Sequence, residues 1–294
     1  MYPVLFTIGD FDITTFGLMM FLSFVGGAWV LGKGMKRYGF SADIAWDMLA
    51  WLAIGGVLGA KLYHLALNFD QVLADPKGMI FNRAGLVWYG GLIGGVTAYL
   101  LQIRARKLPL PVMFDACAPA LFFGYAIGRM GCFLVGDDYG RSTDGWFGIA
   151  FPKGTPPTTA FNLRTQFGDD IPLSVPDSTV MRVHPTQLYE IVLALILFWV
   201  TWQLMKKRMA PGLLFACYML FYAIERFSIE FVRAKSDRFV VGLTTSQVMS
   251  IVLVIGAAVI WFVQKDKAPW DAKLAPAEPR EKPPDKPRDK SKKR

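Results

Sequence analysis

Charged side chains interrupt the long apolar stretches of this 294-residue chain, and they are the residues best able to do chemistry. An ionisable group inside a lipid bilayer costs several kcal/mol unless it faces a partner or a polar cavity, so such groups mark functional sites. Nine of them lie within or at the ends of the apolar stretches: Asp47, Lys61, Asp115, Arg129, Glu190, Glu225, Arg226, Glu230 and Arg233. A set of this size is too large for a passive membrane anchor. The alternative is structural ion pairing, for example between Arg226 and Glu230, which stand four residues apart on one helical face.

Three of these residues are arginines, and they predict a phosphate-binding site. A guanidinium group matches the geometry of a phosphate with two parallel hydrogen bonds, and it is costly to leave unpaired in a membrane. Together, Arg129, Arg226 and Arg233 could hold the phosphate of an anionic phospholipid that enters sideways from the bilayer.

The arginines fall in two of four clusters of polar and glycine residues. The clusters are WYGGLIGG at 88–95, GRMGCFLVGDDYGR at 128–141, HPTQLYE at 184–190 and RFSIEFVR at 226–233. The second cluster is the densest, because four glycines, two arginines and two carboxylates close an apolar stretch. Glycine there lets a ligand or a neighbouring backbone approach closely, although glycine runs are equally typical of surfaces on which helices pack.

The composition indicates that membrane helices must position these clusters. The chain is 53% hydrophobic and 19% charged, whereas an ordinary globular protein has roughly a quarter of charged residues. Seven apolar stretches have about the 20 residues that a helix needs to cross a bilayer: 13–32, 44–67, 85–103, 110–135, 186–205, 211–232 and 241–263. Backbone amides in hydrocarbon must be satisfied within their own segment, so we predict an all-α bundle of about seven transmembrane helices.

Basic residues follow every second stretch, and this alternation predicts the orientation. Lysine and arginine near the end of a span are retained on the cytoplasmic side. They follow the first, third, fifth and seventh stretches: Lys33, Lys36, Arg37, Arg104, Arg106, Lys107, Lys206, Lys207, Arg208, Lys265 and Lys267. We therefore expect the N-terminus outside and the C-terminus in the cytoplasm, with an outside loop at 136–183 of net charge −2. All four clusters then lie toward the outer leaflet. The first stretch lacks a charged leader and a cleavage site, so we expect a retained helix.

We predict that residues 1–264 form a transmembrane domain and that residues 265–294 form a separate cytoplasmic tail. The tail has 11 basic and 6 acidic residues and supplies +5 of the net charge of +9. It is rich in proline and charge, so we expect it to be disordered and attracted to anionic headgroups. The remaining basic residues lie between apolar stretches and do not indicate nucleic-acid binding. Three cysteines in or beside apolar stretches, two histidines and no CxxC pair indicate no disulfide framework and no metal site.

The four clusters, in this order, resemble the prolipoprotein diacylglyceryl transferase family of the bacterial inner membrane. The resemblance covers nearly the whole chain up to about residue 263, and it includes TTFGLMM at 14–20 and LTTSQVMSI at 243–251. It implies a seven-span enzyme without a cofactor. Such an enzyme moves the diacylglyceryl group of phosphatidylglycerol onto the lipobox cysteine of a preprolipoprotein, forming a thioether and releasing glycerol phosphate. The implied partners are phosphatidylglycerol, other membrane lipids and preprolipoprotein signal peptides.

The resemblance also implies a set of site residues. The positions that match the family pattern are Gly128, Arg129, Gly131, Phe133, Gly136, Gly140, Arg226, Glu230 and Arg233. The positions that depart from it are Phe16, Tyr89, Cys132, Val135 and Asp137. We assign catalysis to Tyr89, Arg129, Asp137, Arg226 and Glu230. We assign phosphatidylglycerol binding to Arg129, Gly131, Cys132, Gly140, His184, Arg226 and Arg233.

The implied reaction needs a thiolate and a stabilised leaving group. A thiol with a pKa of about 8.5 must lose its proton before it attacks carbon, and the departing phosphate needs its charge neutralised. We expect Arg129 and Arg226 to stabilise the phosphate, with Arg233 either helping them or paired to Glu230.

Tyr89 and Asp137 are the candidates for the proton acceptor. Tyr89 stands where the family has a histidine, but a phenol with a pKa of about 10 is a poorer base at neutral pH. Asp137 could orient an arginine or accept the proton. Cys132 is interpreted as a small buried side chain in preference to an activated thiolate, and His184 and His64 as structural in preference to catalytic.

The departures from the family pattern leave two alternatives open. One is a lipid-binding relative that has lost the transfer reaction. The other is a transporter or channel in which the intramembrane charges line a path between the two faces.

Overall fold

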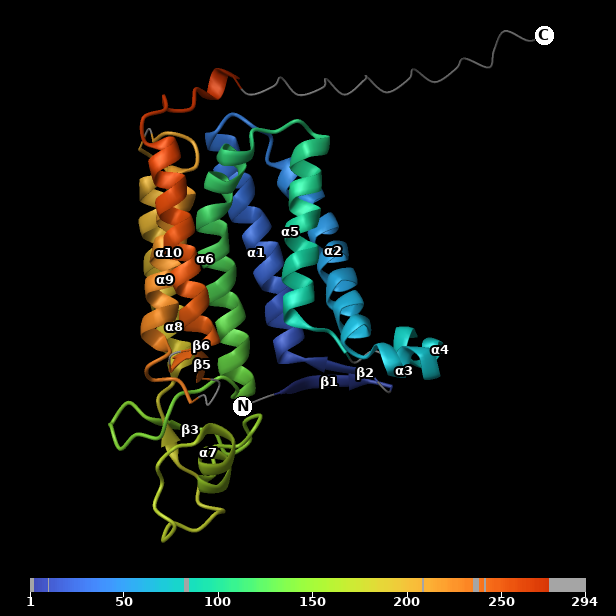
Figure 1. Cartoon of the computed structure of the whole chain (residues 1–294), viewed down its shortest axis with the longest axis vertical. Helices are drawn as coiled ribbons and strands as arrows, with labels where there is room; N and C mark the ends of the chain where they lie inside the picture. Colours follow the sequence, from blue (N-terminus) through green and yellow to red (C-terminus); the bar gives the residue numbers. More distant parts are fainter. Residues whose placement is uncertain are drawn as a thin grey trace, which may run out of the picture.

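The computed structural model describes residues 3–9, 11–81, 85–207, 209–234, 238–240 and 242–274. Long helices stand side by side in a bundle (Figure 1). A helix occupies each of the seven predicted stretches: α1 (Thr15–Arg37), α2 (Asp43–Leu67), α5 (Trp88–Ala105), α6 (Leu110–Val135), α8 (Thr186–Leu204), α9 (Leu213–Ile229) and α10 (Thr245–Gln264). Among the described residues, the five helices α1, α2, α6, α8 and α10 are long and apolar enough to cross a membrane. The protein is therefore a multi-pass helical membrane protein.

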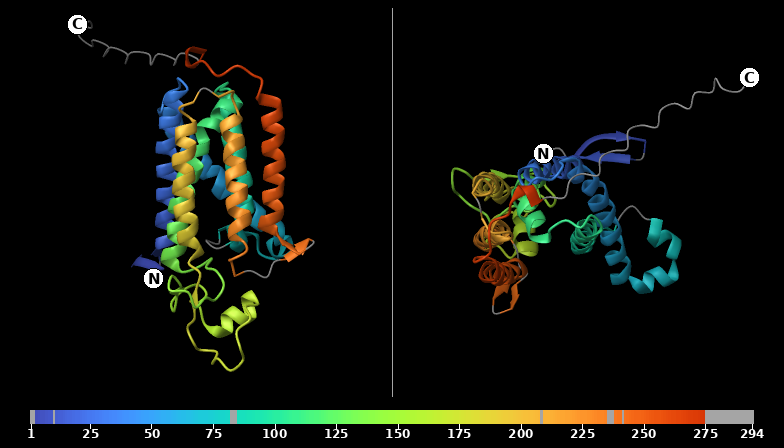
Figure 2. Two further views of the ribbon diagram at one scale, coloured as in Figure 1. Left: turned by 90° about the vertical axis from the view of Figure 1, so that its left-hand side faces the viewer. Right: turned by 90° about the horizontal axis from the view of Figure 1, so that it is seen from above.

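Helix α6 lies at the centre of the bundle. It packs against α1, α8 and α9, while α10 packs against α9 and α5 packs chiefly against α2. The view from above shows α5 and α2 on one side of α6, with α8, α9 and α10 on the other (Figure 2). A cluster of buried side chains joins α2 and α5 to α1 and α6, and it includes Met35, Met48, Ile103 and Met113.

The glycines of the WYGGLIGG cluster form the contact between α5 and α2. A side-chain carbon on Gly94 would collide with the carbonyl oxygen of Gly55, and one on Gly90 would collide with the carbonyl oxygen of Gly59. Small residues allow two helix backbones to approach this closely in a membrane. The sequence left open whether this glycine run admits a ligand or forms a surface on which helices pack. In the structure it forms a helix-packing surface.

Asp115, one of the nine intramembrane charges, binds the start of α9. Its carboxylate accepts hydrogen bonds from the backbone N–H groups of Gly212 (2.7 Å) and Phe215 (2.8 Å). The first N–H groups of a helix lack partners within the helix and carry a partial positive charge, so a carboxylate satisfies both. The residue therefore fixes one end of α9 to the middle helix.

Short strands and helices lie at the ends of the bundle and were not predicted. The strands form three antiparallel pairs: β1 (Val4–Ile8) with β2 (Phe11–Thr14), β3 (Ile149–Ala150) with β4 (Arg182–Val183), and β5 (Arg238–Val240) with β6 (Leu243–Thr244). The short helices are α3 (Phe69–Ala74), α4 (Pro76–Phe81), α7 (Ala160–Phe167) and the 3₁₀ turn η1 (Ala272–Leu274). The bundle itself is all-helical, as predicted.

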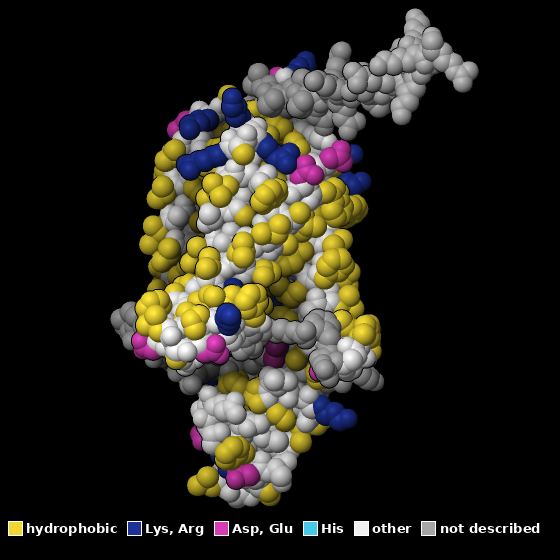
Figure 3. Space-filling view, turned by 90° about the vertical axis from the view of Figure 1, so that its right-hand side faces the viewer, with side chains coloured by type: hydrophobic (Ala, Val, Ile, Leu, Met, Phe, Trp, Pro, Cys, Tyr) yellow, Lys and Arg dark blue, Asp and Glu magenta, His cyan; other side chains and the backbone are white. Residues whose placement is uncertain are grey.

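The predicted outside loop at 136–183 is folded around a small core of its own. Tyr139, Phe151, Leu163 and Val183 are buried in this core. The segment lies at the same end of the bundle as the N-terminus, and the C-terminal segment leaves from the other end (Figure 1). Lysine and arginine side chains gather at that other end, and hydrophobic side chains cover the flank between the two ends (Figure 3).

The residues that follow α10 return to the bundle. The indole N–H of Trp270 donates a hydrogen bond to the backbone oxygen of Tyr38 (3.0 Å), and its ring stacks on Phe40 with the centroids 6.2 Å apart. This contact lies within the segment that we predicted to be disordered from residue 265. Residues 275–294, which make up most of that segment, lie outside the described residues.

Candidate active site

A fully buried carboxylate joins arginines from two helices at the end of the bundle that carries residues 136–183. The Glu190 side chain, on the first turns of α8, is 0% exposed and forms ion pairs with Arg129 of α6 (Nε to Oε2, 3.0 Å) and Arg226 of α9 (Nη1 to Oε1, 2.7 Å). The hydroxyl of Tyr125 donates a hydrogen bond to the same carboxylate (2.9 Å) and lies 3.5 Å from the carboxylate of Glu225. An ionised carboxylate is stable in such surroundings only with charged partners. Glu190 therefore holds the two guanidinium groups together.

A second carboxylate, that of Asp138, bridges Arg129 to the third arginine. Its Oδ2 lies 2.7 Å from Nη1 of Arg129, and its Oδ1 lies 2.5 Å from Nη2 of Arg233. The ion pair between Arg226 and Glu230 that their spacing suggested is present, at 3.4 Å. Arg233, for which Glu230 was also a candidate partner, pairs with Asp138 instead. The three predicted arginines are thus brought into one network of ion pairs.

Asp137 is the carboxylate predicted to orient Arg129. Among the ion pairs of the described residues, however, Arg129 pairs with the neighbouring Asp138 and not with Asp137. Burial raises the pKa of the Asp137 carboxyl, and the adjacent negative charge of Asp138 raises that pKa further. Its Oδ1 is buried without a hydrogen-bond partner among the described residues. This carboxyl therefore holds a proton more readily than an ordinary aspartate does.

The HPTQLYE cluster explains why Asp138 points at the arginines. The chain turns sharply after α6 because Gly136 (φ 78°) and Asp138 (φ 56°) both adopt the left-handed conformation, which aspartate tolerates better than most residues. Two side chains of α8 hold the turn. The hydroxyl of Thr186 donates to the carbonyl of Asp138 (2.8 Å), and the amide of Gln187 donates to the carbonyl of Asp137 (2.5 Å). One motif thus fixes both the turn and, through Glu190, the arginines.

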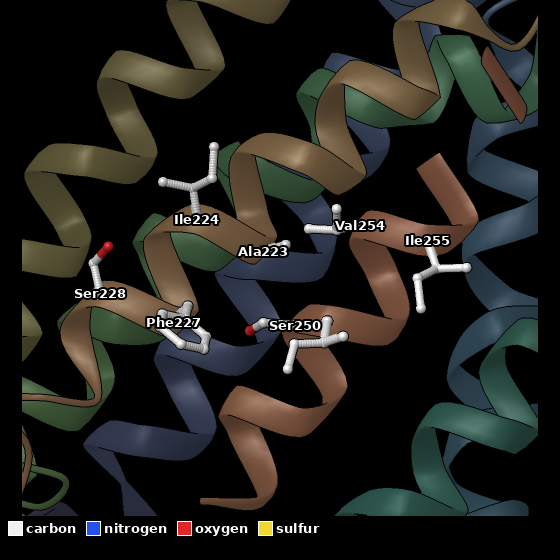
Figure 4. A pocket seen from close by; sticks show the side chains of 8 residues that line it. Ala223, Ile224, Phe227, Ser228, Ser250, Val254 and Ile255 are labelled. Carbon is white, nitrogen blue, oxygen red and sulfur yellow. The ribbon is translucent and has the colours of Figure 1, made fainter. Parts of the chain in front are cut away.

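An open, apolar surface cavity lies between α9 and α10, and Phe227 of its lining follows Arg226 in the sequence. Its volume is ≈270 Å³, and Figure 4 shows the side chains that α9 and α10 contribute to it: Ala223, Ile224, Phe227, Ser228, Ser250, Ile251, Val254 and Ile255. Arg226 donates a hydrogen bond to the hydroxyl of Ser246 (3.0 Å), and the cavity begins one helical turn further along α10, at Ser250. The cavity therefore lies along α9 and α10 close to the end of these helices that carries Arg226.

The described residues contain no group of three or more histidine, cysteine or carboxylate side chains arranged to hold a metal ion. The chemistry of the cluster is that of an anion site, because three guanidinium groups meet at one end of the helices.

The family model described as prolipoprotein diacylglyceryl transferase matches residues 3–263 of this sequence. The chain belongs to this family.

Three relatives illustrate how far the likeness extends, and each is named phosphatidylglycerol–prolipoprotein diacylglyceryl transferase. The protein of Geobacter sulfurreducens is 33% identical over 79% of this chain and 82% of its own length. That of Dehalococcoides mccartyi (strain BAV1) is 32% identical over 90% of this chain and 93% of its own. That of Pseudoalteromonas atlantica is 27% identical over 90% of each chain.

In this member of the diacylglyceryl transferase family, two predicted site glycines make room for protein. A side-chain carbon on Gly131 would lie 3.0 Å from Cβ of Met19 in α1, and one on Gly140 would lie 2.5 Å from the carbonyl oxygen of Val232. Gly140 also forms a backbone bridge with Arg233. The function of Gly140 in the structure is therefore to let the 136–183 segment lie against the chain that carries the third arginine.

The remaining predicted residues of this family member lie around the network. Cys132 is buried, and Nη1 of Arg129 lies 3.6 Å from its sulfur. His184 lies just before α8, with Nδ1 3.3 Å from the hydroxyl of Tyr189 and its carbonyl accepting from Gly140. The assignment of both residues to lipid binding stays a prediction.

Tyr89 lies in the first turn of α5 and is 48% exposed. Helix α5 stands on the opposite side of α6 from α8, α9 and α10 (Figures 1 and 2). Its proposed catalytic role in this family member stays a prediction.

Sequence reasoning left several residues of the network out of the site. Tyr125, Asp138, Thr186, Gln187 and Glu190 all take part in it. A usable signal was present, because Glu190 was among the intramembrane charges and stands three and four residues after Gln187 and Thr186, on the same helical face.

Proposed function

We propose that this chain transfers the diacylglyceryl group of phosphatidylglycerol to the cysteine thiol of prolipoproteins in the bacterial inner membrane. Membership of the family supports this activity. The observation that carries the proposal is the convergence of Arg129, Arg226 and Arg233 on shared carboxylates at one end of the helices. Guanidinium groups held in this way suit the phosphate of an anionic lipid.

We also propose that all seven long helices cross the membrane, with the N-terminus and residues 136–183 in the periplasm and the C-terminus in the cytoplasm. Helices α5 and α9 have 18 and 17 residues, which at 1.5 Å per residue give about 26 Å, close to a hydrocarbon core of about 30 Å. The basic residues at the C-terminal end of the bundle support this orientation. The arginine network then lies near the periplasmic boundary, where a secreted prolipoprotein reaches the membrane.

In the proposed reaction, the thiolate sulfur of the prolipoprotein attacks the glyceryl carbon that bears the phosphate. A carbon–sulfur bond forms as the carbon–oxygen bond breaks, and the bonding electrons leave with the phosphate oxygen. The thiol proton passes to the released glycerol phosphate, directly or through a base. Arg129 and Arg226 lie on either side of Glu190 and would neutralise the charge that develops on the phosphate. Tyr89 and Asp137 are the candidate bases, and the raised pKa of Asp137 favours it as a proton carrier.

We propose that the cavity between α9 and α10 receives an acyl chain of phosphatidylglycerol. Its lining is apolar, and two of its residues, Phe227 and Ser250, stand within about one helical turn of Arg226 and Ser246, which are in contact. A lipid whose phosphate is bound by the arginines would have its acyl chains near this position, extending toward the middle of the membrane. Close packing of the chain against this lining would add van der Waals contacts to the affinity for the headgroup.

The test is transfer from radiolabelled phosphatidylglycerol to a lipobox peptide, together with rescue of cells depleted of their own diacylglyceryl transferase. Arg129→Lys and Arg226→Lys keep the charge but lose the forked geometry, and we expect each to lower kcat/KM by about 100-fold. Arg106→Lys, at the opposite end of the bundle, is the matched control and should keep full activity. Bound lipid without a thioether product would favour a lipid-binding relative that has lost the reaction. Solute flux without lipid modification would favour a transporter.

A further inference from the structure

The arginine network is already neutralised by carboxylates before any substrate binds. Arg129, Arg226 and Arg233 face Asp138, Glu190 and Glu230, which gives three cations and three anions in direct ion pairs. A phosphodiester brings one further negative charge. In a region of low dielectric constant an unbalanced charge is costly, so the arriving phosphate must take the place of one of the carboxylates.

The three carboxylates differ in how readily they can leave. The side chains of Glu190 and Glu230 are 0% exposed, whereas that of Asp138 is 40% exposed. Glu190 and Glu230 also stand on or directly after membrane helices, and Asp138 stands in the turn that follows α6. Rotation of the Asp138 side chain into water therefore costs less than rotation of Glu190 or Glu230, because its side chain already has solvent on one side.

Asp138 also occupies the position that suits a phosphate. Its two oxygens receive one guanidinium nitrogen each, from Arg129 at 2.7 Å and from Arg233 at 2.5 Å. Two oxygens of a phosphodiester can accept from two guanidinium groups in the same way. Exchange of the carboxylate for the phosphate would leave the net charge of the network unchanged and keep both arginines paired throughout.

We propose that Asp138 is a displaceable counter-ion, which pairs with Arg129 and Arg233 in the free protein, yields them to the lipid phosphate, and returns to expel the glycerol phosphate product. This inference rests on the proposed function, since it assigns the phosphate of phosphatidylglycerol to the same arginines. Asp138 is then a positioning residue. It contacts the arginines that bind the substrate, and it takes no part in making or breaking bonds. The affinity for lipid is thereby lowered and product release is accelerated.

The first experiment measures binding of phosphatidylglycerol to the purified full-length protein in nanodiscs of zwitterionic lipid. Asp138→Asn removes the competing charge, and asparagine tolerates the left-handed backbone at this position. The displaced carboxylate makes two partly exposed ion pairs, so we expect binding about tenfold tighter. Binding of uncharged diacylglycerol should not change. Asp144→Asn removes the same charge from an exposed position in the same loop and should leave both affinities unchanged.

The second experiment separates the two steps of turnover. In Asp138→Asn we expect both KM for phosphatidylglycerol and kcat to fall. Inhibition by added glycerol phosphate should become about tenfold stronger, because no carboxylate at position 138 then competes with the product for the arginines. A carboxylate that merely held the arginines in place would produce the opposite result, with weaker binding and a higher KM. Asp138→Gly removes the carboxylate and also suits the positive φ, so it repeats the test if the asparagine variant does not fold.

Unchanged or weaker binding of phosphatidylglycerol by both Asp138 variants would overturn the proposal. Its failure can be distinguished from failure of the proposed function. If the unaltered protein forms no thioether but the variants bind phosphatidylglycerol more tightly, the counter-ion inference holds and the transferase assignment does not. If the unaltered protein is an active transferase and the variants bind no more tightly, the reverse is true.

Discussion

Replacing Glu190 by glutamine tests whether one buried carboxylate holds the arginine network together. The side chain is 0% exposed and forms ion pairs with Arg129 at 3.0 Å and Arg226 at 2.7 Å. Glu190→Gln conserves the shape but removes the charge between two buried cations. Loss of one partner from a buried ion pair costs about 3–5 kcal/mol, because the remaining charge stays in a medium of low dielectric constant.

The free energy of unfolding can be measured by denaturant titration in mixed micelles, alongside transfer to a lipobox peptide. We expect Glu190→Gln to lose about 4 kcal/mol of stability and at least about 100-fold in kcat/KM. The matched control is Asp47→Asn, which breaks the exposed pair between Asp47 and Arg106 at the other end of the bundle and should cost about 1 kcal/mol or less.

A double-mutant cycle adds a sharper test of the same reasoning. When Arg129→Gln is combined with Glu190→Gln, one of the two buried cations that lose Glu190 as a partner is also removed. The double variant should therefore be destabilised by less than the sum of the two single changes, with a coupling energy of about 1–3 kcal/mol. Additive losses, or a Glu190→Gln protein as stable and active as Asp47→Asn, would refute the role given to this carboxylate.

Three further results are expected. Gly140→Ala should lower stability by about 1–3 kcal/mol and reduce transfer, because the new carbon displaces the chain that carries the third arginine; Gly95→Ala, where a side-chain carbon meets no described atom within 4 Å, is the control in thermal unfolding. Val254→Trp should fill the cavity between α9 and α10 and raise KM for phosphatidylglycerol by about tenfold, while Val259→Trp on the exposed face of α10 should not. Asp137→Asn should be more stable than the unaltered protein at neutral pH. The raised folded-state pKa of Asp137 makes its ionised form unfavourable, and this cost is lost as pH falls toward the unfolded value of about 3.9; equal stabilities throughout that pH range would contradict this.

The helices of the bundle could be predicted because the bilayer imposes their length and composition. All seven apolar stretches contain a helix, with ends that differ from the prediction by a few residues. The short strands could not be predicted in the same way. Strands of two to five residues, such as β3 and β4, depend on contacts between distant segments and leave no periodic pattern of their own.

The arginines of the site could be predicted from cost alone, since a guanidinium group in a membrane requires a partner. Which carboxylate serves as that partner could not. Asp137 and Asp138 are adjacent in the sequence, and the choice between them depends on two left-handed residues in the turn after α6. The spacing of four residues between Arg226 and Glu230 correctly suggested an ion pair, but Arg233, for which Glu230 was also a candidate partner, pairs with Asp138.

The hydrogen bonds of Asp115 have a mechanical consequence for the site at the far end of the same helices. This carboxylate fastens the first turn of α9 to α6, and Glu190 links the last turns of both helices through their arginines. Two helices that are bonded to each other near both ends cannot slide past each other. An opening that admits a lipid is then made by movement of other parts of the molecule, while α6 and α9 keep their positions relative to each other.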